Sequence, residues 1–339
     1  MSYRIAPLHR SYKFLSWWAG LVLILSACAP GTGAAAAPTH TLAQQSTATA
    51  SAVQTDTAEL PSATATLTPL PSPTPSLTPT VPTGTPTPDT RLNPDRWDQW
   101  PTLPTVSAVA KEIYARGLAA GNDPHAYSTI GDCQSEPNVF LGIYATNRYW
   151  LGQDYQYLQA TIDFFQGAFD RQSLAVRDGM SAPSALSPLW AYKDQCQEGE
   201  SPVACDLRVH KPSIVFINLG TNWLPGASID AYEKYLRQIV DLVVKAGALP
   251  VLSTKADDVE GGNRINWATA RVAHDYDIPL WNLWRAVQDL PNGGLDATRK
   301  DVYLTTEAWD RRNFTALMVL DRLRTSLKDI YENSPTPTP

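Results

Sequence analysis

The sequence predicts an α/β domain in which helices cover both faces of a mostly parallel sheet, giving a three-layer α/β/α sandwich. Short apolar runs alternate with segments of helical periodicity, and repeated strand–helix–strand units with right-handed crossovers build this architecture. The strongest strand, Ser213 to Leu219, contains a continuous apolar run, as a parallel strand covered on both faces requires. Trp97 to Asn333 spans about 235 residues, which is enough for one domain with its own core.

The individual elements follow from helix and strand signals along the chain. Thr105 is a good N-cap for a first helix, and Gly121 ends it. The first strand, Ala126 to Ile130, leads into the turn Gly131-Asp132-Cys133. The later helices are expected near 155–169, 230–246, 263–274 and 307–331, and the later strands near 173–176, 213–219, 250–253 and 279–283.

A ligand crevice is expected at one edge of this sheet. In open parallel sheets it lies beyond the carboxyl ends of the strands, where the strand order reverses. For a flavodoxin-like order this point is between the first and third strands. The loops there are Gly131 to Ser135 and Gly220 to Trp223.

The N-terminus has the three zones of an export signal: a basic start, an apolar run from Phe14 to Leu25, and small residues. The apolar run is too short to span a bilayer of roughly 30 Å. Leu25-Ser26-Ala27-Cys28 resembles the lipobox of bacterial lipoproteins, which implies that residues 1–27 are removed and that Cys28 is lipidated. The alternative is an ordinary secretory signal that ends near a cysteine by chance. We expect an extracytoplasmic protein anchored to the cell membrane through Cys28.

Residues 28–96 are predicted to be a disordered stalk, because Ala, Thr, Ser and Pro dominate most of this stretch and apolar periodicity is lacking. Its Thr-Pro and Ser-Pro steps favour extended polyproline II at about 3.1 Å per residue. The tail, 334–339, repeats this composition. The domain itself is expected to cover 97–333.

Charge and cysteine content narrow the function classes. The signal holds three of the 27 basic residues and none of the 33 acidic ones, so the mature chain carries a net charge of −9. Nucleic acid is an unsuitable partner for such a chain. Cys196 and Cys205 flank a polar stretch that we expect to be a surface loop closed by a disulfide, although other pairings with Cys133 are open.

Three short motifs resemble the conserved blocks of SGNH/GDSL hydrolases. Ile130-Gly131-Asp132-Cys133-Gln134-Ser135 is similar to the first block, Val176-Arg177-Asp178-Gly179-Met180-Ser181 to the second, and Leu219-Gly220-Thr221-Asn222-Trp223 to the third. The resemblance places Cys133 at the position of the nucleophilic serine. It implies that Gly179 and Asn222 form an oxyanion hole and that Asp132 borders the substrate.

The same resemblance fails at the rest of the triad. Leu304-Thr305-Thr306-Glu307-Ala308-Trp309 is similar to the segment just after the family's last block, where an Asp and a His should precede it. Lys300 occupies the Asp position and Tyr303 the His position, and the nearest carboxylate, Asp301, is displaced by one residue. The domain's histidines, His125, His210 and His274, are expected at the opposite end of the sheet, beyond the reach of a base.

Cys133 therefore has two interpretations: a buried, inert thiol that fills the serine's space, or a nucleophile of lowered pKa. Four aromatic side chains either line a crevice for a glycan ring or pack under long loops: Trp223, Trp190, Trp150 and Tyr192. No spacing typical of metal ligands and no phosphate-binding glycine loop is found, so no metal or cofactor is expected. Three functions compete: a degenerate domain that binds an acylated glycan or similar envelope ligand, an ester hydrolase or acyltransferase that uses Cys133, and a structural or adhesion module.

Overall fold

The computed structural model describes residues 89–300 and 302–334. The predicted signal peptide with Cys28, most of the predicted stalk, Asp301 and most of the predicted tail lie outside these residues. The described part contains a four-stranded sheet, α-helices and short 3-10 helices (η). Its elements are η1 Pro94–Gln99, α1 Ala108–Ala119, β1 Asp123–Gly131, η2 Cys133–Ser135, η3 Gly142–Ala145, η4 Gln153–Leu158, α2 Gln159–Phe164, α3 Ala182–Ala185, η5 Pro188–Trp190, α4 Pro202–His210, β2 Pro212–Asn218, α5 Ile229–Lys245, β3 Leu249–Ser253, α6 Arg264–Tyr276, β4 Leu280–Trp281, α7 Leu283–Val287, η6 Pro291–Gly294, α8 Thr306–Ser326 and α9 Lys328–Glu332.

All strand pairings within the sheet are parallel, in the order β1-β2-β3-β4. A parallel bridge between Gly131 and Val176 places the predicted 173–176 strand on the other side of β1. Counted with this segment, the order is the flavodoxin-like 2-1-3-4-5. The predicted fold class, an α/β sandwich around a parallel sheet, is confirmed.

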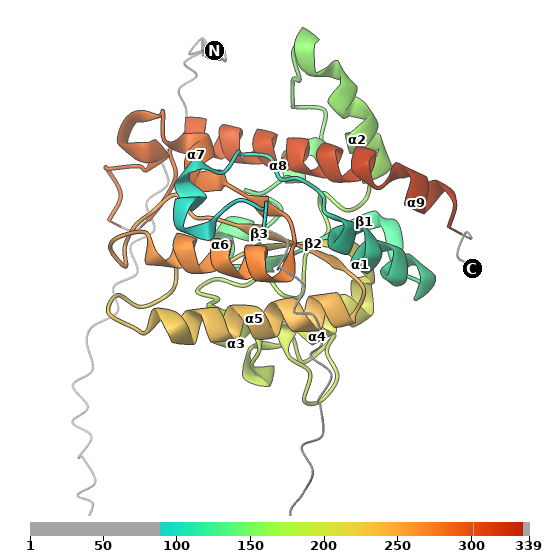
Figure 1. The fold of residues 1–339 in the computed structure, drawn as a ribbon, viewed down its shortest axis with the longest axis horizontal. Helices are drawn as coiled ribbons and strands as arrows, with labels where there is room; N and C mark the ends of the chain where they lie inside the picture. Colours follow the sequence, from blue (N-terminus) through green and yellow to red (C-terminus); the bar gives the residue numbers. More distant parts are fainter. Residues whose placement is uncertain (1–88, 301, 335–339) are drawn as a thin grey trace, which may run out of the picture. The chain divides into compact units, whose positions relative to one another are not determined.

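Both faces of the sheet are buried, as the apolar run in β2 predicts. Ile214 and Phe216 belong to a core with side chains of α1, α2, α7 and α8, whereas Val215 and Ile217 belong to a second core with α4, α5 and α6. Figure 1 shows α8 on one side of the strands, and α5 and α6 on the other. Helices therefore cover both faces, and the carboxyl ends of the strands are left for loops.

Several expected boundaries are wrong. The first helix is capped by Ser107, whose side chain accepts a hydrogen bond from the Ala110 amide, and not by Thr105. The expected helix at 155–169 starts as the 3-10 helix η4, and α2 ends at Phe164. The strand at 173–176 is reduced to one bridge, and the last helix is interrupted at Leu327.

The largest correction concerns the stretch between Cys196 and Cys205, which the sequence predicts to be a surface loop. It is not only a surface loop, because α4 begins within it at Pro202, after the N-cap Ser201. Cys205 lies on this helix and is fully buried. None of the described helices is long and apolar enough to cross a bilayer.

Candidate functional site

The turn after β1 requires a glycine. A Cβ at Gly131 would lie 2.3 Å from the Ser135 hydroxyl and 2.9 Å from the Asn218 carbonyl oxygen. The lack of a side chain lets η2 fold back against the end of β2. Asp132 caps η2, because its Oδ1 accepts a hydrogen bond from the Gln134 amide at 3.0 Å. Cys133 is thereby fixed as the first residue of η2, two residues beyond the carboxyl end of β1.

The environment of Cys133 favours a neutral thiol. Burial, a hydrogen bond with the Asp178 side chain and the negative charges of Asp132 and Glu136 raise its pKa to about 11. The side chain is only partly buried, so a reagent can reach it. At pH 7 a thiol with this pKa is ionised in roughly one molecule in ten thousand. The group within reach of the sulfur is thus a carboxylate and not an imidazole.

The three histidines of the described residues lie where the sequence predicts, near the amino ends of the strands. His125 is the third residue of β1, and its Nδ1 contacts the Phe164 carbonyl oxygen at 2.8 Å. His210 ends α4 and contacts Asp206 at 2.9 Å, while His274, near the end of α6, contacts Asp89 at 3.2 Å. The remaining length of β1 spans about 20 Å at roughly 3.3 Å per residue. None of them is a base for Cys133.

The motifs at the predicted oxyanion hole come together. The Nδ2 of Asn222 donates hydrogen bonds to Asp132 Oδ2 at 3.0 Å and to the Met180 carbonyl oxygen at 3.2 Å. Gly179 precedes Met180, has a φ of +72° and is exposed. Both amide hydrogens of Asn222 are directed at the protein, so the side chain tethers the three loops. Burial above all raises the pKa of Asp132.

Lys300 and Tyr303 are not assembled with this group. Lys300 is exposed. Tyr303 is half-buried, with the Arg299 guanidinium over its ring at 3.2 Å from the ring centroid, and its carbonyl accepts a hydrogen bond from the Asp296 amide at 2.8 Å. Within the part of the chain that the structure describes, no hydrogen bond joins either residue to Cys133. Neither replaces the missing acid–base pair.

The predicted aromatic crevice is only partly present. The Trp223 ring packs against Tyr232 at 5.5 Å between centroids, and its Nε1 is buried with no hydrogen-bond partner. Trp190 is half-buried near Gly179, whose added Cβ would lie 3.9 Å from its ring. Tyr192 donates to the Val176 carbonyl oxygen at 3.2 Å, and Trp150 is 79% exposed. Trp223 is half-buried, and the contact with Tyr232 fixes its ring.

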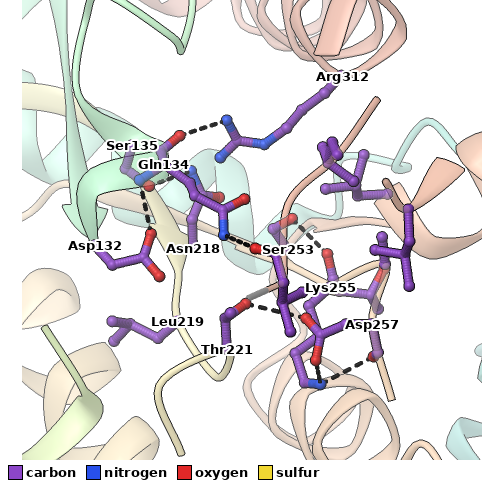
Figure 2. A pocket seen from close by; sticks show the side chains of 16 residues that line it. Asp132, Gln134, Ser135, Asn218, Leu219, Thr221, Ser253, Lys255, Asp257 and Arg312 are labelled. Carbon is purple, nitrogen blue, oxygen red and sulfur yellow. Dashed lines mark hydrogen bonds and ion pairs between the residues drawn. The ribbon is translucent and has the colours of Figure 1, made fainter. Parts of the chain in front are cut away.

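A cavity that sequence reasoning missed lies at the same end of the sheet. Its volume is about 40 Å³, which holds a few water molecules at the roughly 10–15 Å³ that one requires. Ser135, Asn218, Lys255, Asp257 and Arg312 line it, as Figure 2 shows, together with Asp132 and Gln134. Cys133, Gly179 and Asn222 do not line it.

One wall of the cavity is a buried ion cluster. Lys255 Nζ contacts Asp257 Oδ1 at 2.5 Å and Glu260 Oε2 at 2.7 Å, and all three side chains are buried. The other Asp257 oxygen accepts from the Thr221 hydroxyl at 3.2 Å, and Glu260 Oε1 accepts from the Ile265 amide at 3.0 Å. The cluster is internally satisfied and joins the ends of β2 and β3 to the start of α6.

The disulfide between Cys196 and Cys205 is confirmed, and Cys133 is the free cysteine of the described residues. Within those residues, Cys196, Glu200 and Cys205 form a group of metal-ligand types. The two sulfurs are bonded to each other and cannot act as thiolate ligands, so this group does not fit a metal.

No family model matches this sequence, and no curated protein matches it. Similar solved structures include a GDSL-like lipase from Bacteroides thetaiotaomicron (16% identity, 63% of this chain and 98% of that chain, TM-score 0.38) and a putative acylhydrolase from Bacteroides fragilis (14%, 64% and 98%, 0.39). A psychrotrophic esterase from Pseudoalteromonas sp. is also similar (16%, 62% and 100%, 0.35). The fold class is established by the chain's own strand pairing.

The sequence contains a signal for some of the cavity residues but not for Arg312. Asn218 ends the strongest strand, and Lys255 to Asp258 follows β3, so both lie at predicted strand ends. Arg312 lies in a helix rich in charged residues, where a buried arginine has the same pattern as an exposed one. Its burial depends on the packing of α8 against the turn after β1.

Proposed function

We propose that this chain is a cell-surface lipoprotein whose domain is a catalytically degenerate relative of SGNH/GDSL hydrolases. It binds an acylated glycan or a similar envelope ligand and does not hydrolyse it. The observation that carries the proposal is the surroundings of Cys133: its charged neighbours are the carboxylates of Asp178, Asp132 and Glu136, and the described histidines lie at the far end of the sheet.

Ester hydrolysis at this position lacks a histidine base among the described residues, and the side chain of one expected oxyanion donor, Asn222, is engaged. A base must remove the nucleophile's proton, and donors must stabilise the oxyanion. The carboxylates around Cys133 disfavour the thiolate, which is the attacking species. The two hydrogens of Asn222 Nδ2 are already donated to Asp132 and Met180. The chain therefore retains the loops of such a site without its activated groups.

Ligand binding is supported by the exposed rim around these loops. Asp178, Gly179 and Asn222 are exposed, and so are two apolar side chains that neighbour the site in sequence, Leu189 (87%) and Leu224 (73%). Polar hydrogen-bonding groups beside exposed apolar side chains suit a ligand that carries both hydroxyl and acyl groups.

An active hydrolase or acyltransferase is the second candidate, because Cys133 is partly exposed and begins a 3-10 turn. The test is hydrolysis of p-nitrophenyl acetate and butyrate by the full chain and by Cys133→Ala. We expect the two proteins to give the same rate, close to that of buffer. Turnover that Cys133→Ala abolishes would overturn the proposal and establish the second candidate.

The same proteins are then assayed for binding to acetylated and deacetylated envelope glycans. We expect binding that is unchanged in Cys133→Ala and at least fivefold weaker in Leu224→Asp, which places a charge on the exposed rim. Asp98→Asn, an exposed change elsewhere, is the control. If no glycan binds, the binding half of the proposal is wrong even where hydrolysis is absent.

A further inference from the structure

The cavity at the carboxyl ends of β1 to β3 holds a buried guanidinium that has no carboxylate partner among the described residues. Arg312 is 4% exposed, and the one hydrogen bond of its guanidinium in this part of the chain is from Nη1 to the Gln134 carbonyl oxygen at 2.7 Å. Its guanidinium lies over the Phe140 ring at 4.2 Å from the centroid. Figure 2 shows this contact with Gln134 and the rest of the group at the cavity wall.

A buried charge in this state is costly unless hydrogen bonds compensate it. Arginine has five N–H donors, so four remain after the bond to Gln134. Burial lowers the pKa of Arg312 to about 10, which leaves the group charged at neutral pH. The free donors need an acceptor.

The acidic side chains of the cavity wall are already engaged. Asp132 accepts from the Gln134 amide through Oδ1 and from Asn222 through Oδ2. Asp257 is paired with Lys255 and accepts from Thr221. Neither forms an ion pair with Arg312, although the Asp132 charge is close enough to favour the charged guanidinium. Among the described residues of the wall, Arg312 therefore has no ion-pair partner.

Two further polar groups face the same space without full partners. The amide of Asn218 makes one long contact, 3.5 Å from Nδ2 to the Ser135 oxygen, and its Oδ1 is buried without a partner. Whichever way this amide is turned, one end remains unpaired. Ser135 is 3% exposed, and within the described residues its hydroxyl makes only this long contact with Asn218.

We propose that this cavity binds a compact carboxylate, of the size of formate or acetate, which pairs with Arg312 and accepts hydrogen bonds from Ser135 and Asn218. A planar guanidinium offers two parallel N–H donors that match the two oxygens of a carboxylate. A volume of about 40 Å³ limits the occupant to a few heavy atoms. Asp132 and Asp257 on the wall disfavour a dianion such as phosphate. The site does not involve Cys133, so the inference stands whether or not the domain is a hydrolase.

The experiment measures binding of sodium acetate to the full chain by calorimetry and by the shift in unfolding temperature, with sodium chloride at equal ionic strength as reference. We expect saturable binding and stabilisation with acetate, a weaker effect with formate, and none with chloride, phosphate or benzoate. Glucuronate separates a free small acid from a sugar carboxylate that reaches into the cavity. Absence of acetate-specific binding in the wild-type chain overturns the proposal.

Variants of the cavity residues test whether acetate binds at Arg312. Arg312→Gln should weaken acetate binding at least tenfold, whereas Arg322→Gln, the same change at an exposed position of α8, should leave it unchanged. If Arg312→Gln does not fold, Asn218→Asp replaces it, because this isosteric change adds a negative charge and should also abolish binding. Binding that survives these changes contradicts the proposal. The proposal is also contradicted if acetate binds only to the Asp301→Asn variant, because the carboxylate of Asp301 would then be the partner of Arg312.

Discussion

At the scale of single residues, the reactivity of Cys133 depends on its neighbours and not on its position in the motif alone. Cys133 follows the turn where the resemblance implies a nucleophile, and it is accessible. Burial first, and then the carboxylates of Asp178, Asp132 and Glu136, nevertheless raise its pKa and favour the neutral thiol. A motif identifies the position of a side chain, while the reactivity depends on charges that other segments bring to it.

Asp178→Asn should make Cys133 more reactive. It removes a carboxylate that raises the pKa through a hydrogen bond and through its charge, although burial is the larger cause and remains. We expect iodoacetamide to label Cys133 several-fold faster at pH 8 in the variant. In the wild-type chain labelling should climb with pH toward a midpoint of about 11. Peptide mass spectrometry measures the labelling rate, and Asp98→Asn is the charge-matched control. Equal labelling rates in the wild-type chain and both variants would refute the role of Asp178.

At the scale of elements, α4 shows what the sequence pattern could not reveal. The stretch from Gln197 to Ala204 is polar enough to predict a loop, but Ser201 caps a helix and Pro202 occupies its first turn. Asp206, 1% exposed, accepts hydrogen bonds from the Ser173 hydroxyl and the Leu174 amide, and its Oδ1 lies 2.9 Å from His210 Nδ1. The contacts with Ser173 and Leu174 hold α4 beside the short 173–176 segment, and no local periodicity predicts them.

The disulfide should stabilise this element through the unfolded chain. Cys196 and Cys205 are separated by 9 residues in sequence. In the chain-entropy model, closing a loop of this length raises the free energy of the unfolded state by about 2–3 kcal/mol. We expect Cys196→Ala/Cys205→Ala to lower the free energy of unfolding by about that amount, with the helical circular dichroism signal retained. Urea titration measures the change. Dithiothreitol should destabilise the wild-type chain to the same level and leave the double variant unaffected, and a double variant of unchanged midpoint would contradict this.

At the scale of the whole molecule, the sequence predicts the sheet well because its strands are buried on both faces. The run in β2 and the alternation with α5 and α6 predict a parallel sheet buried on both faces, which the structure confirms. The predicted crevice loops also meet, through Asn222, Asp132 and Met180. The Arg312 cavity was beyond prediction because it forms only when α8 packs against the turn after β1.

The proposal for the whole chain also depends on Cys28, which lies outside the described residues. Two or three acyl chains hold a protein at a membrane far longer than one, since each buried methylene adds about 0.8 kcal/mol. We expect Cys28→Ser to remove labelling by radioactive palmitate and to release the protein from the membrane fraction, without changing the unfolding temperature of the domain. Cys133→Ser is the matched control and should keep both the label and the membrane association. Membrane association that persists in unlabelled Cys28→Ser would mean that another segment anchors the chain.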